Sequence, residues 1–211
     1  MAERDELYVA VVEGDWKAAA AATQSALAGG MAPTTIVSKS LVPAMDEVGR
    51  RFDCEEYFVP EMLISARAMK ASMEILRPLL AATGAEPVGR VVIGTVKGDL
   101  HDIGKNLVAA MLEGGGFEVI DLGADVAPER FIQAAAARNA NLVALSALLT
   151  VTMPSMKTTI EAFRAAGLRE KVKIMVGGAP VTEQYAQTIG ADGYGESAGA
   201  AVVLARKLVA G

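Results

Sequence analysis

The sequence contains very few of the side chains that build metal cages and covalent cross-links. Among its 211 residues there is one cysteine, Cys54, and one histidine, His101. A single cysteine excludes an intrachain disulfide, and a single histidine excludes a metal centre with several imidazole ligands. His101 can still ligate a metal whose other ligands come from a cofactor. Asp99 stands two residues earlier, where it could serve as the hydrogen-bond partner that such a ligand needs.

Other features are also scarce, and each absence excludes a class of protein. Aromatic residues make up 5% of the chain, and the formal net charge is −5 with no basic tract, which argues against nucleic acid as a partner. No apolar run approaches the roughly 20 residues of a membrane span. The charged start, residues 1–6, does not resemble a signal peptide. We therefore expect a cytoplasmic protein that binds neither nucleic acid nor a membrane, in agreement with the single cysteine.

Hydrophobic residues, in contrast, make up 52% of the chain, which is enough to form a core. In the first part of the sequence these residues recur at helical spacing. Asp15 is typical of a helix N-cap, a second helix is expected from about residue 33 with a kink or break at Pro43, and a third is expected over 60–80. The pattern predicts a helical bundle that forms a domain of residues 1–85.

The spacing of apolar residues changes after residues 84–89, which combine glycine and proline as a linker does. Beyond them, short β-branched runs alternate with alanine-rich helical stretches over 90–211. This alternation predicts an α/β domain with a doubly wound, Rossmann- or flavodoxin-like parallel sheet of five strands. The predicted strands are 91–95, 117–121, 142–146, 172–176 and 193–194; the predicted helices are 102–114, 127–138, 154–167, 181–189 and 197–209.

Ligands of such sheets bind outside the carboxyl ends of the strands, so the candidate loops are 95–104, 146–153 and 177–181. The first loop carries glycines, which raises the question of a phosphate cradle. Five residues separate Gly98 from Gly104, however, where a P-loop has four, and Asn106 stands where a P-loop needs a hydroxyl for magnesium. A dinucleotide fingerprint is also absent from this turn. Both nucleotide-binding hypotheses therefore fail on the residues themselves.

Three short motifs occupy these loops in order: Asp99-x-His101-x-x-Gly104, Ser146-x-Leu148-x-Thr150 and Gly177-Gly178. In this order they resemble the cobalamin-binding domain shared by methionine synthase and the corrinoid proteins of methyltransferase systems. Residues 57–62 and 65–70 resemble the helical cap of the same family. The resemblance thus covers nearly the whole chain.

The resemblance implies a cofactor and a role for the single histidine. The cofactor is expected to be cobalamin or a related corrinoid, with a methyl group on cobalt in its methylcobalamin form. In the family a protein histidine replaces the corrinoid's own base below the cobalt, and His101 matches that position. Asp99 is expected to accept a hydrogen bond from the other ring nitrogen, and Thr152 to extend this relay. His101, Asp99 and Thr152 are the expected catalytic set, with His101 as the metal ligand.

The resemblance also implies where the rest of the cofactor binds. The displaced nucleotide tail is expected in a slot beside the sheet, where glycines permit close approach of the backbone. On the upper face, Phe58 matches an aromatic that shields the methyl group, Met62 is expected to add adaptable surface, and the linker 84–89 is expected to act as a hinge. The expected cofactor-binding residues are Gly98, Asp99, His101, Asp102, Gly104, Ser146, Leu148, Thr150, Gly177, Gly178 and Phe58.

The function implied is that of a methyl carrier between two enzymes. One partner, a donor methyltransferase, would methylate cobalt from a small donor, and an acceptor methyltransferase would pass the methyl group to a thiol or tetrahydrofolate. A reductive activase is a third candidate partner. On this interpretation the chain is a subunit of a cobalamin-dependent methyltransferase system and not a complete enzyme. The alternatives are a cobalamin-dependent sensor or regulator, an adenosylcobalamin mutase subunit, and a corrinoid store.

Overall fold

The computed structural model describes residues 5–84 and 86–210, without the side chain of residue 81. The chain divides into two compact units. The first runs to Pro87 and includes Glu113–Gly116, and the second contains Val88–Leu112 and the residues from Phe117 onward. Residue 85 of the expected hinge and residues 1–4 of the chain start lie outside the described residues. Each unit is described separately below.

The first unit is helical, as the apolar spacing predicts. Asp15 caps the second helix, because its side chain accepts hydrogen bonds from the backbone N–H groups of Lys17 and Ala18 at 3.1 and 3.0 Å. Met62 is fully buried, so the expectation that it adds adaptable surface is wrong. The helices are α1 (Glu6–Val12), α2 (Trp16–Ala28), α3 (Pro33–Ile36), α4 (Val42–Asp53) and α5 (Val59–Ala82).

The interruption expected at Pro43 takes the form of a change in helix type. Between α3 and α4 the chain forms a π-helical turn, Val37–Leu41. Pro43 then lies in the first turn of α4. A proline has no N–H to donate to the preceding turn, and a wider turn leaves room for its ring. The helical path therefore continues through the proline.

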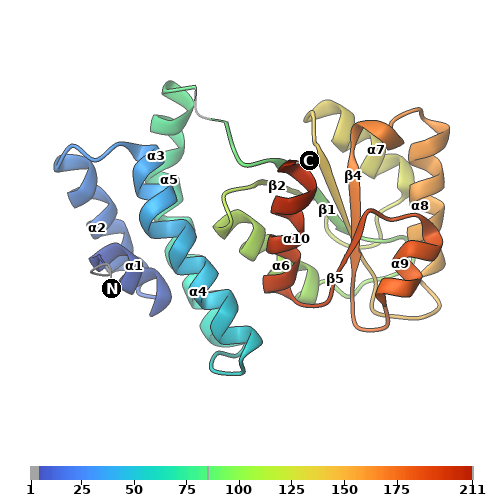
Figure 1. Ribbon diagram of the computed structural model, residues 1–211, viewed down its shortest axis with the longest axis horizontal. Coiled ribbons are helices and arrows are strands. Elements are labelled where there is room, and N and C mark those ends of the chain that lie inside the picture. The colour runs from blue at the N-terminus through green and yellow to red at the C-terminus, as the bar shows by residue number, and fades with distance from the viewer. Residues whose placement is uncertain (1–4, 85, 211) are drawn as a thin grey trace. The chain divides into compact units, whose positions relative to one another are not determined.

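The second unit confirms the predicted α/β fold. Its five strands are all parallel in the order β2-β1-β3-β4-β5, which is the flavodoxin-like order. Figure 1 shows the sheet with helices on both of its faces. The strands are β1 (Arg90–Thr95), β2 (Glu118–Asp121), β3 (Leu142–Ser146), β4 (Lys173–Gly177) and β5 (Gly193–Gly195). The helices are α6 (Ile103–Gly114), α7 (Pro128–Ala137), α8 (Pro154–Ala165), α9 (Glu183–Ile189) and α10 (Ala198–Ala210), with a 3-10 turn at Arg169–Lys171.

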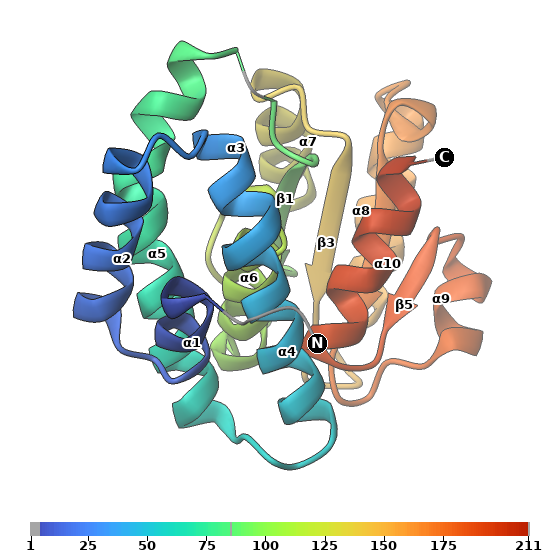
Figure 2. The ribbon, with the colours of Figure 1, turned by 60° about the vertical axis from the view of Figure 1, so that its left-hand side comes forward.

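The two faces of the sheet are covered differently. Helices α7, α8 and α9 pack on one face, where Phe131 and Phe163 are fully buried against Val143 and Ile174 in a continuous apolar core. Helices α6 and α10 lie over the other face, as Figure 2 shows from a turned view. The second face has less apolar filling, and it contains the cavity described below.

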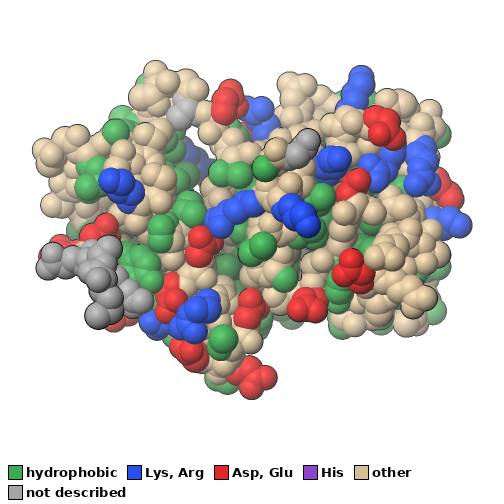
Figure 3. Space-filling view, in the orientation of Figure 1, with side chains coloured by type: hydrophobic (Ala, Val, Ile, Leu, Met, Phe, Trp, Pro, Cys, Tyr) green, Lys and Arg blue, Asp and Glu red, His purple; other side chains and the backbone are tan. Residues whose placement is uncertain are grey.

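Charge on the surface is mixed where Figure 3 shows it. Over the second unit, the face shown in Figure 3 carries Lys and Arg side chains interspersed with Asp and Glu. None of the described helices combines the length and the apolar character that crossing a bilayer requires.

Candidate functional site

The site lies at the carboxyl ends of β1 and β3, where the topology switches. The connection after β1 leads to α6 on one face of the sheet, and the connection after β3 leads to α8 on the opposite face. The two loops diverge and leave a crevice between them. The predicted Asp99, His101, Ser146 and Thr152 all lie on these two loops.

Asp99 is fully buried between the loops and joins them through hydrogen bonds. One carboxylate oxygen accepts from the backbone N–H of His101 at 3.0 Å. The other accepts from the Thr152 hydroxyl at 2.6 Å and from the backbone N–H groups of Leu148 and Leu149 at 2.8 and 3.3 Å. A buried carboxylate is tolerated only with such partners. Asp99 therefore holds the β3 loop in place as well as its own loop.

The surroundings of Asp99 determine its charge. Burial by itself raises the pKa of the carboxyl group, but hydrogen bonds from the Thr152 hydroxyl, the backbone N–H groups of His101 and Leu148, and the His101 ring outweigh it. Together they hold the pKa of Asp99 well below its ordinary value. Asp99 is thus a carboxylate across the neutral range and accepts hydrogen bonds with both oxygens.

His101 has one ring nitrogen bound and the other presented outward. Its Nδ1 lies 2.7 Å from the Asp99 carboxylate, and half of its side chain is exposed. Because a carboxylate can only accept, Nδ1 carries the proton in this contact and neutral His101 keeps a lone pair on Nε2. The Thr95 hydroxyl donates to the His101 carbonyl at 3.0 Å and so fixes the backbone of the loop. Among the described residues, no three His, Cys, Asp or Glu side chains gather as a metal cluster.

A third loop, between β2 and α7, also holds the Asp99 segment. The Asp125 carboxylate accepts a hydrogen bond from the Gly98 N–H at 2.7 Å. The Asp125 N–H donates in return to the Asp99 carbonyl at 2.9 Å. Asp125 makes these contacts with φ at 54°, in the left-handed region that aspartate tolerates better than most residues. No sequence motif identifies Asp125, because its contact with Gly98 joins two loops that are far apart in the sequence.

Replacing Asp125 by alanine should loosen this segment, because the Gly98 N–H loses its acceptor and alanine disfavours the left-handed conformation. The expected cost is about 1 kcal/mol, since the contact is exposed. Amide hydrogen exchange at Gly98 should accelerate about fivefold, as that free energy implies. Asp125→Asn keeps an acceptor and the conformation, so it should stay near the wild-type rate. Unchanged exchange in the alanine variant would contradict the role given to Asp125.

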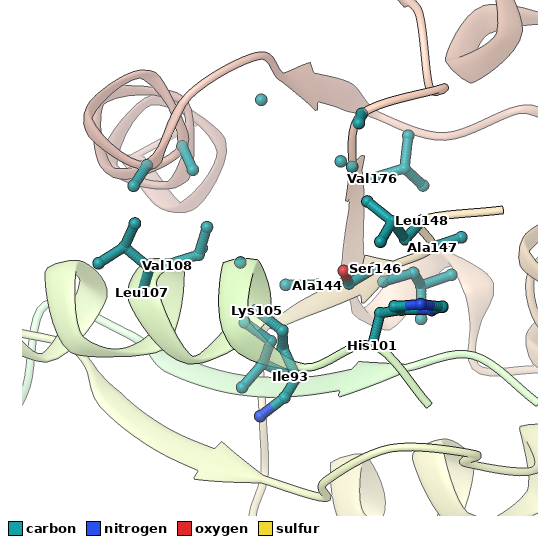
Figure 4. Close-up of a pocket in the computed structure, with 18 of the residues that line it drawn as sticks. Ile93, His101, Lys105, Leu107, Val108, Ala144, Ser146, Ala147, Leu148 and Val176 are labelled. Atoms are coloured by element: carbon teal, nitrogen blue, oxygen red, sulfur yellow. The ribbon is translucent and has the colours of Figure 1, made fainter. Parts of the chain in front are cut away.

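Beside the His101 loop the second unit contains a cavity of about 650 Å³. Figure 4 shows His101, Ser146 and Leu148 at one end of it and the residues of α6 along its side. Of the predicted binding residues, Gly98, Asp99 and Thr150 do not line it, and Thr152 stays behind Asp99. The predicted residues that do line it are His101, Asp102, Gly104, Ser146, Leu148, Gly177 and Gly178.

Two positions in the lining of this cavity are glycine for different reasons. Gly178 has φ of 130°, and a Cβ there would lie 1.9 Å from the Ala147 carbonyl oxygen, so no other residue fits. Gly104 lines the cavity from the first turn of α6, and a Cβ there would meet nothing within 4 Å. A side chain at position 104 would therefore occupy the cavity. The cavity is a cradle that accepts a ligand of considerable size, as an elongated cofactor tail requires.

Several cavity residues escaped the motif search. Ile93, Ala144 and Met175 line the cavity from the strands, and Leu107 lines it from α6. The alternation of side chains along each strand could have identified the strand residues, because each lies two positions before the last residue of its strand. Lys105 lines the cavity with its stem and is almost fully buried, and its ammonium group bonds Asp121.

Phe58 belongs to the first unit and lies immediately before α5. It is 63% exposed, so its ring is open to solvent. Its backbone N–H donates to the Glu61 side chain at 3.0 Å, which orders the start of the helix.

Comparison with known proteins agrees with this geometry. Family models described as "B12 binding domain" match residues 89–203 and, separately, residues 3–77. Dimethylamine corrinoid protein 1 of Methanosarcina acetivorans is 43% identical over 206 residues, covering 97% of this chain and 96% of the relative. Trimethylamine corrinoid protein 1 of the same organism is 42% identical over 204 residues, covering 94% of each.

A solved structure gives the same result. The methanol:cobalamin methyltransferase complex MtaBC from Methanosarcina barkeri contains a chain that matches with a TM-score of 0.85 and 30% identity. The match covers 98% of this chain and 79% of the other. With these relatives, the buried Asp99, the outward His101 and the glycine-lined cavity have one common explanation. The chain belongs to the B12 binding domain family, whose cofactor is cobalamin or a related corrinoid.

Proposed function

We propose that the protein carries a methyl group on the cobalt of a corrinoid between a donor-specific methyltransferase and an acceptor methyltransferase. The observation that carries the proposal is the orientation of His101, whose Nδ1 is bound to a buried carboxylate while Nε2 remains available. The likeness to corrinoid proteins of methylamine and methanol systems supports the methyl-carrying role. Small methylated amines or methanol are the proposed donors, and a thiol or tetrahydrofolate is the proposed acceptor.

In this role the corrinoid supplies a cobalt ion with four ring nitrogens, which can take up and release a methyl group. The protein would contribute a nitrogen ligand, His101, and the groups that orient it. Neutral His101 would offer Nε2 to the lower face of the cobalt. Asp99 would fix the Nδ1–H tautomer and the orientation of the ring, and Thr152 would hold Asp99 through its hydroxyl.

The cavity is proposed to hold the nucleotide tail of the corrinoid. Gly104 leaves open space beside it, Gly177 and Gly178 line the cavity with bare backbone, and the Ser146 side chain lies at the entrance (Figure 4). Leu148 is 43% exposed beside His101 and is proposed to lie under the ring. Asp102, Thr150 and Gly98 are proposed to contact the polar edge of the cofactor from the same loops.

The helical region, residues 1–85, is proposed to act as a cap over the upper face, and residues 90–211 as the cofactor-binding domain. The exposed ring of Phe58 would shield the methyl group from water. The linker 84–89 would allow the cap to move aside when a methyltransferase needs the same face. A reductive activase is proposed as a third partner, and the cytoplasm as the location.

Reconstitution with a corrinoid tests this function. Under reducing conditions the protein should bind cobalamin tightly enough to survive gel filtration, with a cobalt-dependent visible spectrum. Once methylated, it should transfer the methyl group to or from the methyltransferase of a methylamine or methanol system. A reconstituted protein without a corrinoid spectrum would overturn the proposal. Radical turnover with adenosylcobalamin, or salt-sensitive binding of duplex DNA, would support one of the alternative functions instead.

A further inference from the structure

The floor of the cavity consists of two rows of residues with different chemistry. Parallel pairing aligns Ile93 with Ala144 and Ala144 with Met175 in an inner row. Two residues nearer the carboxyl edge, Ser146 is aligned with Gly177 in an outer row on the same face. The inner row is apolar and almost fully buried, while the outer row carries a hydroxyl and a bare backbone.

The walls beside the inner row are apolar as well. Leu107 and Val108 line the cavity from α6, and Ala198 and Ala201 line it from α10. Leu107 and both alanines are buried. The small alanines keep α10 from filling the space. The inner part of the cavity is thus a narrow apolar slot between two helices and the sheet.

The polar groups of the cavity lie at its entrance or point away from it. Ser146 is the last residue of β3, and Glu196 and Ser197 directly follow β5. All three therefore lie at the carboxyl edge of the sheet. Lys105 reaches the slot only with its stem, because its ammonium group bonds Asn106 and Asp121. Figure 4 shows the Lys105 nitrogen directed away from the slot.

The backbone under the inner row offers little more. Ile93, Ala144 and Met175 belong to β1, β3 and β4, which all have strands paired on both sides, so their N–H and C=O groups are used in the sheet ladder. A ligand group that enters the slot therefore exchanges water for hydrocarbon surface. A polar ring edge in that position loses its hydrogen bonds to water without replacement.

We infer that this slot selects corrinoids by the chemistry of their lower base, and prefers an arene with few polar edge atoms, such as a substituted benzimidazole or a phenol, over a purine. The inference rests on the proposed placement of the nucleotide tail in the cavity. A purine base presents ring nitrogens and often an amino group around its edge, and each needs a partner that the inner row does not supply. The methyl-bearing or hydrocarbon edge of an arene gains contact with Met175, Leu107 and Ile93 instead.

Binding measurements with defined corrinoids test the inference. Cobinamide lacks the nucleotide tail, so its dissociation constant serves as the reference. The contribution of the tail is the dissociation constant of cobinamide divided by that of each complete corrinoid. Kd values for cobalamin, a phenol-type corrinoid and an adenine-type corrinoid would be determined by spectral titration. Each value is corrected for the fraction of free corrinoid whose base is detached from cobalt. The tail contribution should be at least tenfold larger for either arene than for adenine, about the cost of one unmade hydrogen bond.

Variants of the inner row provide the matched comparison. Met175→Gln adds a donor and an acceptor at similar volume and should reduce the preference at least threefold, whereas Met175→Leu should retain it. Ala144→Ser serves the same purpose if the glutamine variant does not fold. Equal tail contributions in the wild-type protein, or a preference that neither polar variant changes, would overturn the inference while leaving corrinoid binding intact. Failure of cobinamide and of every complete corrinoid to bind would instead contradict the proposed function.

Discussion

Replacing His101 by alanine is expected to remove the axial nitrogen from cobalt and to lower the rate of methyl transfer by at least about 100-fold. Removing a group that hydrogen-bonds a metal ligand typically costs about 10–100-fold, and removing the ligand itself should cost more. His101 is the only histidine in the chain, so no other imidazole can replace it. Electron paramagnetic resonance of the Co(II) form should show nitrogen coupling from the axial ligand in the wild-type protein. The same signal should be absent from the variant.

The variant should still fold, which makes the result interpretable. Half of the His101 side chain is exposed, and Asp99 keeps its bonds from Thr152, Leu148 and Leu149 when the ring is removed. Lys97→Ala is a suitable control, because Lys97 lies in the same loop and is exposed. It should leave the Co(II) spectrum unchanged. A His101→Ala protein that kept the axial nitrogen coupling would contradict the assignment of His101 as the ligand.

The sheet was predictable because its three central strands, β1, β3 and β4, are mainly buried. β1 and β3 are nearly continuous apolar runs, and their observed bounds differ by at most one residue from those that the sequence predicts. The sequence also predicts the short β5, at residues 193–194, and the observed strand is Gly193–Gly195. Once the strands are placed, the parallel topology puts their carboxyl ends at one edge. For this reason, the loops of Asp99, Ser146 and Gly177 could be brought together from sequence alone.

Other features depend on contacts that leave no pattern in the sequence. Asp125 reaches Gly98 from another loop, with a backbone conformation that its residue type permits but does not require. In the sequence Lys105 is an ordinary lysine near a helix start, and only the fold places Asp121 beside it and buries its stem. The apolar inner row around Met175 becomes a cavity only because α10 carries alanines opposite it. These features arise from the distances between elements, which periodicity does not determine.

Replacing Asp99 by asparagine is expected to destabilise the second unit by about 3 kcal/mol. The carboxylate accepts hydrogen bonds with both oxygens, from His101 on one side and from Leu148 and Thr152 on the other. An amide has a single acceptor oxygen, so its NH₂ group must face the donors on one of these two sides, which are left without an acceptor. Denaturant unfolding, followed by circular dichroism at neutral pH, measures the loss. Asp102→Asn makes the same chemical change three residues further along the chain, where the carboxylate accepts a long bond from Asn106 at 3.2 Å. It should cost less than about 1 kcal/mol.

The difference between wild type and Asp99→Asn should depend on pH in a defined direction. The pKa of Asp99 is lower in the folded protein than its ordinary value of 3.8, so the folded state favours the carboxylate. Its contribution to stability is therefore full above about pH 4 and declines as the pH falls below that value. The two proteins should converge in stability in acid. A difference that grew on acidification would mean that the folded state favours protonated Asp99.

The same variant separates the orienting role of Asp99 from its structural role. Because the chain has one histidine, nitrogen chemical shifts of the imidazole report His101 alone, without any corrinoid present. The wild-type protein should show the tautomer with the proton on Nδ1, held by the carboxylate 2.7 Å away. In Asp99→Asn the tautomers should mix, and in Thr152→Val, which removes only the hydroxyl behind Asp99, the Nδ1 form should persist. An unchanged tautomer in Asp99→Asn would show that the charge of the carboxylate is not needed to orient the ring, and that the charge would then act only to hold the two loops together.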